Sequence, residues 1–155
     1  MEPIRLRPHH VLDIVAYWKP DDEPDYERKP GENGVRTVRR MMTEGLDIPA
    51  EFGPGPDCIC EPCSHLQSDG RCDEILQHYG RPLPMDDYND PLDRRVLDYL
   101  GMEDGARMTV REFLELVNRN VPGVELVSHR PNETDEWRRD AYVKGLTELG
   151  IRQAT

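Results

Sequence analysis

Residues 90–120, DPLDRRVLDYLGMEDGARMTVREFLELVNRN, contain two amphipathic helix patterns in succession and decide the fold class. Asp90 is a candidate N-cap. Pro91 suits the first helical position, because a backbone N–H at that position has no intrahelical hydrogen-bond acceptor and proline lacks the N–H. Thr109 is followed three residues later by Glu112, which is the spacing of a capping box. Apolar residues recur at helical spacing, namely Leu92, Val96, Leu97 and Leu100 in the first pattern and Val110, Phe113, Leu114 and Val117 in the second. We expect one helix from Pro91 that ends at Gly101 and a second over 109–120.

The same periodicity, followed outward in both directions, predicts further helices and a few strands. The expected helices are HHVLDIVAYW (9–18), VRTVRRMMTEG (35–45), a short DEILQHYG (73–80) and TDEWRRDAYVKGLTELG (134–150), the last with Trp137, Ala141, Leu146 and Leu149 facing inward. The expected strands are PIRLRP (3–8), a brief one near Phe52 and GVELVSH (123–129), and RPLPMDDYN (81–89) is expected to be a connector. We therefore predict a mainly α fold with two or three short β-strands, an α+β class.

Length and composition predict one soluble domain over residues 1–155. A chain of 155 residues suffices for one modest core, and 36% apolar against 33% charged residues indicates a polar protein. The stretch 19–34, KPDDEPDYERKPGENG, is acidic and proline-rich, and we expect a solvated loop. No stretch approaches the roughly 20 apolar residues of a membrane helix, and the start MEPIRLRPHH lacks the apolar region of a signal peptide. These features predict a cytoplasmic protein that does not bind membranes.

The net charge bears on partners. A formal charge of −11 argues against nucleic acid, whose phosphates would repel the chain. A docking partner would then be basic, although an acidic surface that simply maintains solubility is the plainer interpretation.

All four cysteines lie in one module, residues 53–72, which ends in DCICEPCSHLQSDGRC. Cys58, Cys60, Cys63 and Cys72 form the pattern C-x-C-x2-C-x8-C. A reducing cytoplasm disfavours disulfides, so this density of thiols indicates a metal site. Four buried cysteines with packing roles only are a weaker alternative, because chance rarely gathers every cysteine so closely. A disulfide redox switch is also possible in principle, but CEPC lacks the preceding strand and following helix of a thioredoxin-like site.

The spacing distinguishes an iron–sulfur cluster from zinc only in part. The C-x2-C step suits both. In an extended C-x-C step the two side chains lie about 6–7 Å apart on one side of the chain. Two thiolates at about 2.3 Å from one zinc ion must lie within about 4 Å of each other, whereas a four-iron cluster offers each thiolate its own iron. The step therefore favours a cluster, while a bent backbone would still allow zinc.

Histidines and one aspartate are candidates to complete the site. His65 lies two residues after Cys63, so it is a candidate metal ligand or a candidate hydrogen-bond donor to a metal ligand. His9 and His10 open the first expected helix, where neighbours point about 100° apart, so we do not expect both to reach one centre. Asp13 lies one turn further along, on a face that can look toward the same site. His78 and His129 are expected at the surface or in structural roles.

Three segments together resemble a small uncharacterised bacterial and archaeal domain family. They are IRLRPHHVLD, DCICEPCSHLQSDGRCD and YNDPLDRRVLDYLG, and the resemblance runs in order from Ile4 to about Val117. Members of that family are labelled predicted iron–sulfur-binding proteins, which implies an iron–sulfur cluster here but no known substrate or reaction. By position, Cys60, Cys63 and Cys72 match the cysteines of the family's module.

The chain also departs from the family. Many relatives have a cysteine on the first helix, in a run like HHLLC, where this chain has Asp13, and aspartate where it has Cys58. The fourth ligand is therefore either Cys58, moved into the loop, or Asp13 or a histidine.

The sequence thus leads to one hypothesis and two alternatives. The first is a protein with one [4Fe-4S] cluster, held by Cys58, Cys60, Cys63 and Cys72, that serves electron transfer with a protein redox partner or an undefined redox or sulfur reaction. The second is a structural zinc site in an interaction module. The third is an enzyme whose cluster has one iron open to substrate, with His9, His10 and Asp13 as acid–base or positioning groups.

Overall fold

The computed structural model of the chain describes residues 2–19, 34–55, 75–76 and 83–153. These residues form the helices α1 (Pro8–Ala16), α2 (Gly34–Glu44), α3 (Met85–Leu100), α4 (Val110–Arg119), α5 (Glu125–Ser128) and α6 (Asp135–Glu148). They also form the strands β1 (Ile4–Leu6), β2 (Pro49–Phe52), β3 (Ile75–Leu76), β4 (Leu83–Pro84) and β5 (Ala106–Thr109). The predicted α+β class with a helical majority is confirmed.

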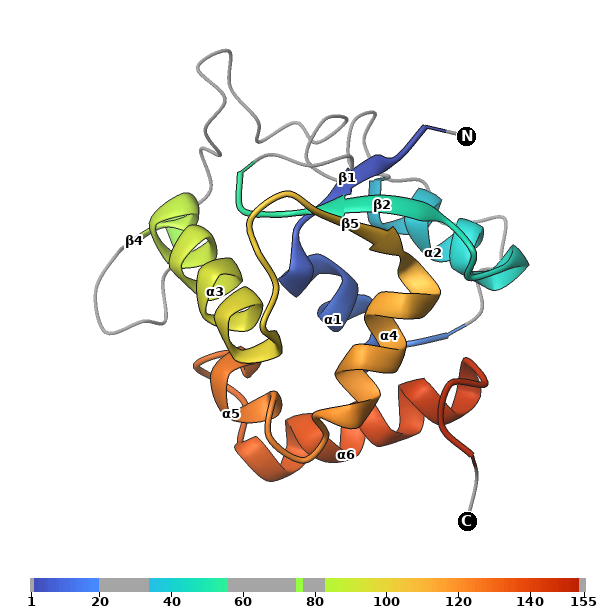
Figure 1. The fold of residues 1–155 in the computed structure, drawn as a ribbon. Coiled ribbons are helices and arrows are strands. Elements are labelled where there is room, and N and C mark those ends of the chain that lie inside the picture. The colour runs from blue at the N-terminus through green and yellow to red at the C-terminus, as the bar shows by residue number, and fades with distance from the viewer. Residues whose placement is uncertain (1, 20–33, 56–74, 77–82, 154–155) are drawn as a thin grey trace.

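A mixed three-stranded sheet organises the fold, in the order β1-β2-β5. β1 and β2 are parallel, with Leu6 opposite Phe52, and β5 runs antiparallel to β2, with Met108 opposite Ala50. A parallel pair needs a crossover connection, and here that connection contains α1 and α2. In Figure 1 the sheet lies along the top, α6 crosses the bottom, and α3 and α4 flank α1.

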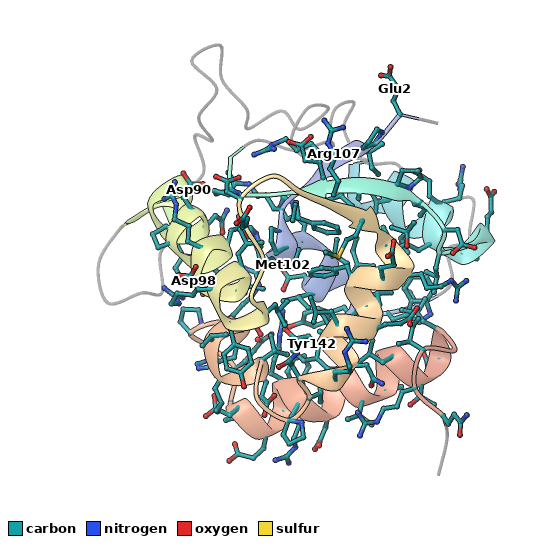
Figure 2. The ribbon with its side chains drawn as sticks, in the orientation of Figure 1. Glu2, Asp90, Asp98, Met102, Arg107 and Tyr142 are labelled. Carbon is teal, nitrogen blue, oxygen red and sulfur yellow. The ribbon has the colours of Figure 1, made fainter. Side chains whose placement is uncertain are left out.

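The core lies between the sheet and the helices. Phe52 of β2 stacks on Phe113 of α4 with ring centroids 4.4 Å apart, which joins the sheet to that helix. In Figure 2 Met102 and Tyr142 lie among the enclosed side chains, and both are buried. Glu2 and Arg107 lie at the outer edge, and both are exposed. α1 packs directly on α6, since a Cβ on Gly145 would lie 2.0 Å from the carbonyl oxygen of Val15. Within the described residues, no helix has both the length and the apolar character needed to cross a membrane.

Several predicted elements are confirmed. The capping box of α4 forms, with the Glu112 N–H donating to Thr109 Oγ1 at 3.1 Å and the Thr109 N–H donating to Glu112 Oε1 at 3.0 Å. All four apolar residues predicted for that helix are buried. α1, α2 and α6 follow the predicted ranges closely, and β1 and β2 lie where short strands are expected.

The predicted start of α3 is wrong, because the helix begins at Met85 and encloses Pro91. Asp90 does not cap it. Its Oδ1 accepts hydrogen bonds from Arg7 Nη1 at 2.7 Å and from the Gly55 N–H at 3.3 Å. These tertiary contacts use the carboxylate that the sequence pattern assigns to an N-cap. The prediction of a connector over 81–89 is also wrong, because residues 83–84 form β4 and residues 85–89 belong to α3.

Two further predictions on the short elements are wrong. Ile75–Leu76 is a strand paired with Leu83–Pro84, where a helix over 73–80 is expected, and the rest of that range lies outside the described residues. Residues 125–128 form a helical turn, where a strand over 123–129 is expected. Local bonds stabilise this turn, since Ser128 Oγ donates to the Val124 carbonyl at 2.7 Å and the Gly123 N–H donates to Glu125 Oε1 at 2.6 Å.

The inward face of α6 also differs from the prediction. Leu146 is buried as expected, but Trp137 is 44% exposed. The buried positions are Arg138, Tyr142, Gly145 and Leu146. A buried cation, Arg138, therefore occupies a place that periodicity alone assigns to apolar residues. β5 is missed altogether, because Ala-Arg-Met-Thr alternates apolar and polar residues over only four positions, which is too short a pattern to predict a strand. The predicted loop 19–34 lies outside the described residues except for Lys19 and for Gly34, which begins α2.

Candidate functional site

The four cysteines and His65 lie outside the described residues, as does His78. The predicted ligand set Cys58, Cys60, Cys63 and Cys72 therefore stays a prediction. The structure does describe the chain on both sides of the module, and it describes His9, His10 and Asp13.

The first three residues of the module are each held by a hydrogen bond. The Gly53 N–H donates to the Leu6 carbonyl at 3.2 Å, Arg5 Nη2 donates to the Pro54 carbonyl at 2.7 Å, and the Gly55 N–H donates to Asp90. These contacts hold the start of the module beside the end of β1 and the first turns of α3. Asp90, labelled in Figure 2, lies on this part of α3. Beyond the module, β3 pairs with β4, which leads directly into α3. Both sides are thus attached near the same helix.

His9 lies next to this attachment and forms a buried pair with Asp93. Its Nδ1 lies 2.7 Å from Asp93 Oδ1, and its backbone N–H donates to the same oxygen at 3.1 Å. Arg7 Nη1 donates to the other carboxylate oxygen of Asp93 at 2.9 Å. His9 is 2% exposed and Asp93 is fully buried. Arg7, Asp93 and His9 thus form one buried chain of contacts between α1 and α3.

Charge in this chain of contacts is set by burial and by the neighbours. Burial lowers the pKa of His9, despite the opposing attraction of Asp93. Burial alone would raise the pKa of Asp93, but the attraction of His9 and Arg7 outweighs it and the pKa is lowered. A neutral imidazole beside a carboxylate donates its Nδ1–H, so the lone pair remains on Nε2. His9 has the tautomer that a metal ligand or a general base requires.

His10 follows His9 on α1, and the two imidazole rings are in contact. Its ring centroid lies 4.4 Å from that of His9 with the two planes tilted by 51°. His10 lines a cavity of about 300 Å³ together with Asp13, Ile14, Tyr17, Arg39 and Arg130. His9 pairs with Asp93 of α3, and His10 borders the cavity between α1 and α2. The expectation that the two histidines do not share one centre stays a prediction.

Asp13 is held by two arginines. Arg138 Nη2 donates to Asp13 Oδ1 at 2.6 Å, and Arg130 Nη2 donates to Oδ2. Burial opposes ionisation of this carboxyl, but the two guanidinium groups outweigh it and lower the pKa of Asp13 to about 2. Its side chain is 20% exposed. Each oxygen of Asp13 already accepts a charge-assisted hydrogen bond, so the structure does not place His9 and Asp13 on a common partner.

Sequence reasoning missed Arg7, Asp93 and Arg138 as residues of this region. A signal existed for Asp93, since Asp90 and Asp93 lie three apart and so share a helix face. Within the described ranges, no group of three His, Cys, Asp or Glu side chains is arranged to hold a metal ion.

Comparison of the chain with protein-family models, with curated proteins and with solved structures found no match. The resemblance to the uncharacterised domain family therefore stays a prediction from the sequence.

Proposed function

We propose that this chain binds one [4Fe-4S] cluster through Cys58, Cys60, Cys63 and Cys72. The observation that carries the proposal is the spacing C-x-C-x2-C-x8-C, which gathers every thiol of the chain within residues 58–72. Four thiolates are the donor set of such a cluster, and the C-x-C step favours separate irons over one zinc ion. When bound, the cluster supplies one-electron redox chemistry at a potential set by its surroundings.

The surroundings of Asp13 support Cys58 as the fourth ligand. To bind iron, Asp13 would have to give up Arg130 or Arg138, and Arg138 is fully buried, which makes an unpaired guanidinium there costly. Cys58 lies within a few residues of the other thiols in the sequence, so closing the site costs little chain entropy.

This chain's own residues also supply a setting for chemistry near the module. The Asp93 carboxylate holds His9 as the neutral tautomer with its lone pair on Nε2, and Arg7 keeps that carboxylate ionised. This pair favours a second candidate, an enzyme in which His9 moves a proton or holds a ligand beside a cluster with one open iron. We further propose a cytoplasmic location, which would keep the thiols reduced for metal binding, and a protein redox partner. The charge of −11 argues against a role for nucleic acid.

The test is anaerobic purification followed by metal and sulfide analysis. We expect a brown protein with broad visible absorption and about four iron and four sulfide per chain. A colourless protein with one zinc per chain would instead support the structural zinc site. Two stable disulfides in freshly isolated protein would exclude both kinds of metal centre.

The fourth ligand is tested by comparing Cys58→Ala with Asp13→Asn. We expect Cys58→Ala to lose iron or to change the electron paramagnetic resonance spectrum of the reduced protein. Asp13→Asn should keep both while its stability falls. The reverse result would make Asp13 the ligand and would move the enzyme ahead of simple electron transfer.

A further inference from the structure

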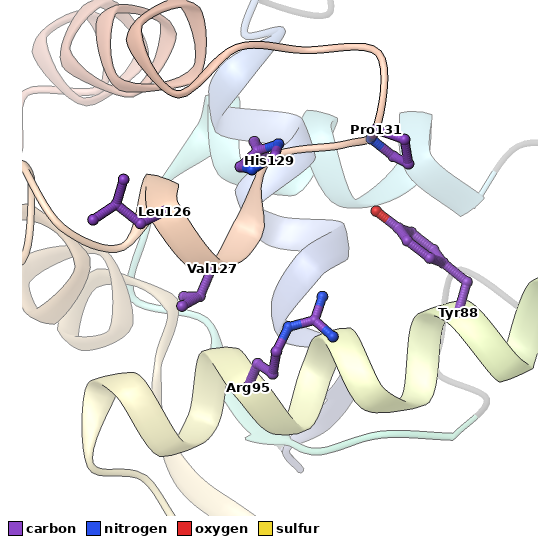
Figure 3. Close-up of a pocket in the computed structure, with 6 residues that line it drawn as sticks. All are labelled: Tyr88, Arg95, Leu126, Val127, His129 and Pro131. Carbon is purple, nitrogen blue, oxygen red and sulfur yellow. The ribbon is translucent and has the colours of Figure 1, made fainter. Parts of the chain in front are cut away.

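A second cavity lies away from His9 and His10, between α3 and the α5 region. Its volume is about 250 Å³, and it is lined by Tyr88, Arg95, Leu126, Val127, His129 and Pro131. It shares no lining residue with the cavity at His10. Figure 3 shows Tyr88 and Arg95 rising from α3 toward the segment that carries His129 and Pro131, with Leu126 and Val127 on α5. Nothing in the proposed cluster chemistry uses these residues.

Arg95 gives this cavity a positive wall. Its guanidinium points from α3 toward α5 (Figure 3), and no hydrogen bond or ion pair joins it to the rest of the described chain. The neighbouring groups are already engaged: His129 Nε2 lies 3.1 Å from Asp135 Oδ1, and His129 Nδ1 lies 3.0 Å from the Arg130 carbonyl. What distinguishes Arg95 from its neighbour Arg94, which also has no acidic partner among the described residues, is that Arg95 lines the cavity. A planar guanidinium in this state is suited to bind a carboxylate through two parallel hydrogen bonds.

The opposite wall is apolar. Leu126 is 58% exposed, the most exposed of the large apolar side chains in the described residues, and Val127 and Pro131 extend its surface. Covering apolar surface is favourable by about 25 cal/mol per Å². The cavity therefore has a cationic side chain on one wall and apolar side chains on the other.

We propose that this cavity binds a small monocarboxylate with one short branched or aromatic group. The carboxylate lies on Arg95, and the apolar group lies against Leu126, Val127 and Pro131. The volume falls just below the roughly 300–1,000 Å³ of sites for drug-sized ligands, so the ligand is small. A phosphate dianion fits poorly, because the wall offers one unpaired cation and Asp135 stands beside His129. The same chemistry occurs in a free acid and in the C-terminal leucine of a peptide.

The proposal is tested by calorimetric titration of the full chain with 4-methylpentanoate and phenylacetate. We expect saturable binding with a dissociation constant on the order of 1 mM, as befits a ligand of this size. Acetate lacks the apolar group and 4-methylpentanamide lacks the charge, and each should bind at least about tenfold more weakly. Equal binding of the amide, or no saturation by either acid, overturns the proposal. N-acetylglycylleucine distinguishes the sources: tighter binding than the free acids indicates a peptide terminus, and weaker binding indicates a free acid.

Matched variants locate the site. Arg95→Gln should weaken the binding of 4-methylpentanoate at least about tenfold, whereas Arg94→Gln, the neighbouring exposed arginine on α3 that does not line the cavity, should leave it unchanged. Leu126→Ser should weaken 4-methylpentanoate but not acetate. Equal losses in Arg95→Gln and Arg94→Gln would mean a general charge effect and would overturn the assignment. The result does not depend on iron content, so it fails or succeeds independently of the proposed cluster.

Discussion

At the scale of single residues, the ion pairs of α1 show how much tertiary structure decides. Asp13 is a candidate ligand by position, yet it is the acceptor for Arg130 and Arg138. The sequence shows an acidic residue on a helix, but the two arginines come from more than a hundred residues further along. Only the packing of α1 on α6 brings Arg138 to it. Spacing along α1 could identify His9, His10 and Asp13 as candidate site residues. It could not predict which residues each of them contacts in the folded chain.

The first prediction concerns Asp13 and acid. Its pKa is lowered from 3.8 to about 2, so ionised Asp13 stabilises the folded state above about pH 4, and this stabilisation is lost as pH falls toward 2. The shift corresponds to about 2 kcal/mol. The stability gap between the chain with Asp13 and the Asp13→Asn chain should therefore narrow by about that amount between pH 5 and pH 2. Urea unfolding measures it, with both chains carrying Cys63→Ser so that acid-labile metal does not contribute. A gap that does not change with pH would contradict the ion pairing.

The second prediction concerns Asp93. Asp93→Asn leaves Arg7 buried without a full counter-charge and removes the acceptor of His9, so we expect a loss of about 3–5 kcal/mol in the free energy of unfolding. Asp90→Asn is the control, because Asp90 contacts the same Arg7 nitrogen from a partly exposed position. It should cost about 1 kcal/mol or less. Similar denaturation midpoints for the two variants would show that the buried contacts of Asp93 stabilise the fold no more than the partly exposed ion pair of Asp90 does.

At the scale of elements, the sequence predicts what local chemistry controls. Thr109 and Glu112 define the start of α4 because the capping box needs only neighbouring residues. The start of α3 could not be predicted, since Asp90 serves Arg7 and Gly55, which come from other elements. β5 can be identified as a strand only from its pairing with β2, because four residues are too few to show a strand pattern in the sequence. Residues 123–129 look like a strand by composition, but hydrogen bonds from Gly123 and Ser128 stabilise a turn of helix instead.

The third prediction tests the contact between α1 and α6. An added Cβ at Gly145 would lie 2.0 Å from the Val15 carbonyl oxygen, a backbone atom that can move only if α1 shifts. Gly145→Ala should therefore lower the free energy of unfolding by about 1–3 kcal/mol, despite the better helix propensity of alanine. Gly45→Ala has nothing within 4 Å of its Cβ and serves as the control. Thermal denaturation followed by circular dichroism measures both. If Gly145→Ala melts no lower than Gly45→Ala, the close approach of the two helices is wrong.

At the scale of the whole molecule, the described core and the proposed metal site come from different parts of the sequence. The buried apolar residues come from the sheet and from the helices on both sides of the module, from Leu6 to Leu146. The module itself contains few apolar residues. The described residues at its two ends are held by hydrogen bonds, of Gly53 with Leu6, of Gly55 with Asp90, and between β3 and β4. The metal centre that we propose would add to the stability of a fold whose described part has its own core, since anything bound only by the folded state stabilises it.

The last prediction follows from this division. Cys63→Ser should lose most of the iron and lower the melting temperature by several degrees, because 1 kcal/mol corresponds to roughly 2–4 °C for a chain of this size. The helical circular dichroism signal should persist, since all the buried apolar residues of the described core lie outside the module in the sequence. Ser64→Ala is the neighbouring control and should keep both iron and melting temperature. Loss of the helical signal in Cys63→Ser would mean that the core cannot form without metal. An unchanged melting temperature with the iron gone would mean that the contacts of Gly55 with Asp90 and of β3 with β4 hold the module's two ends without help from metal.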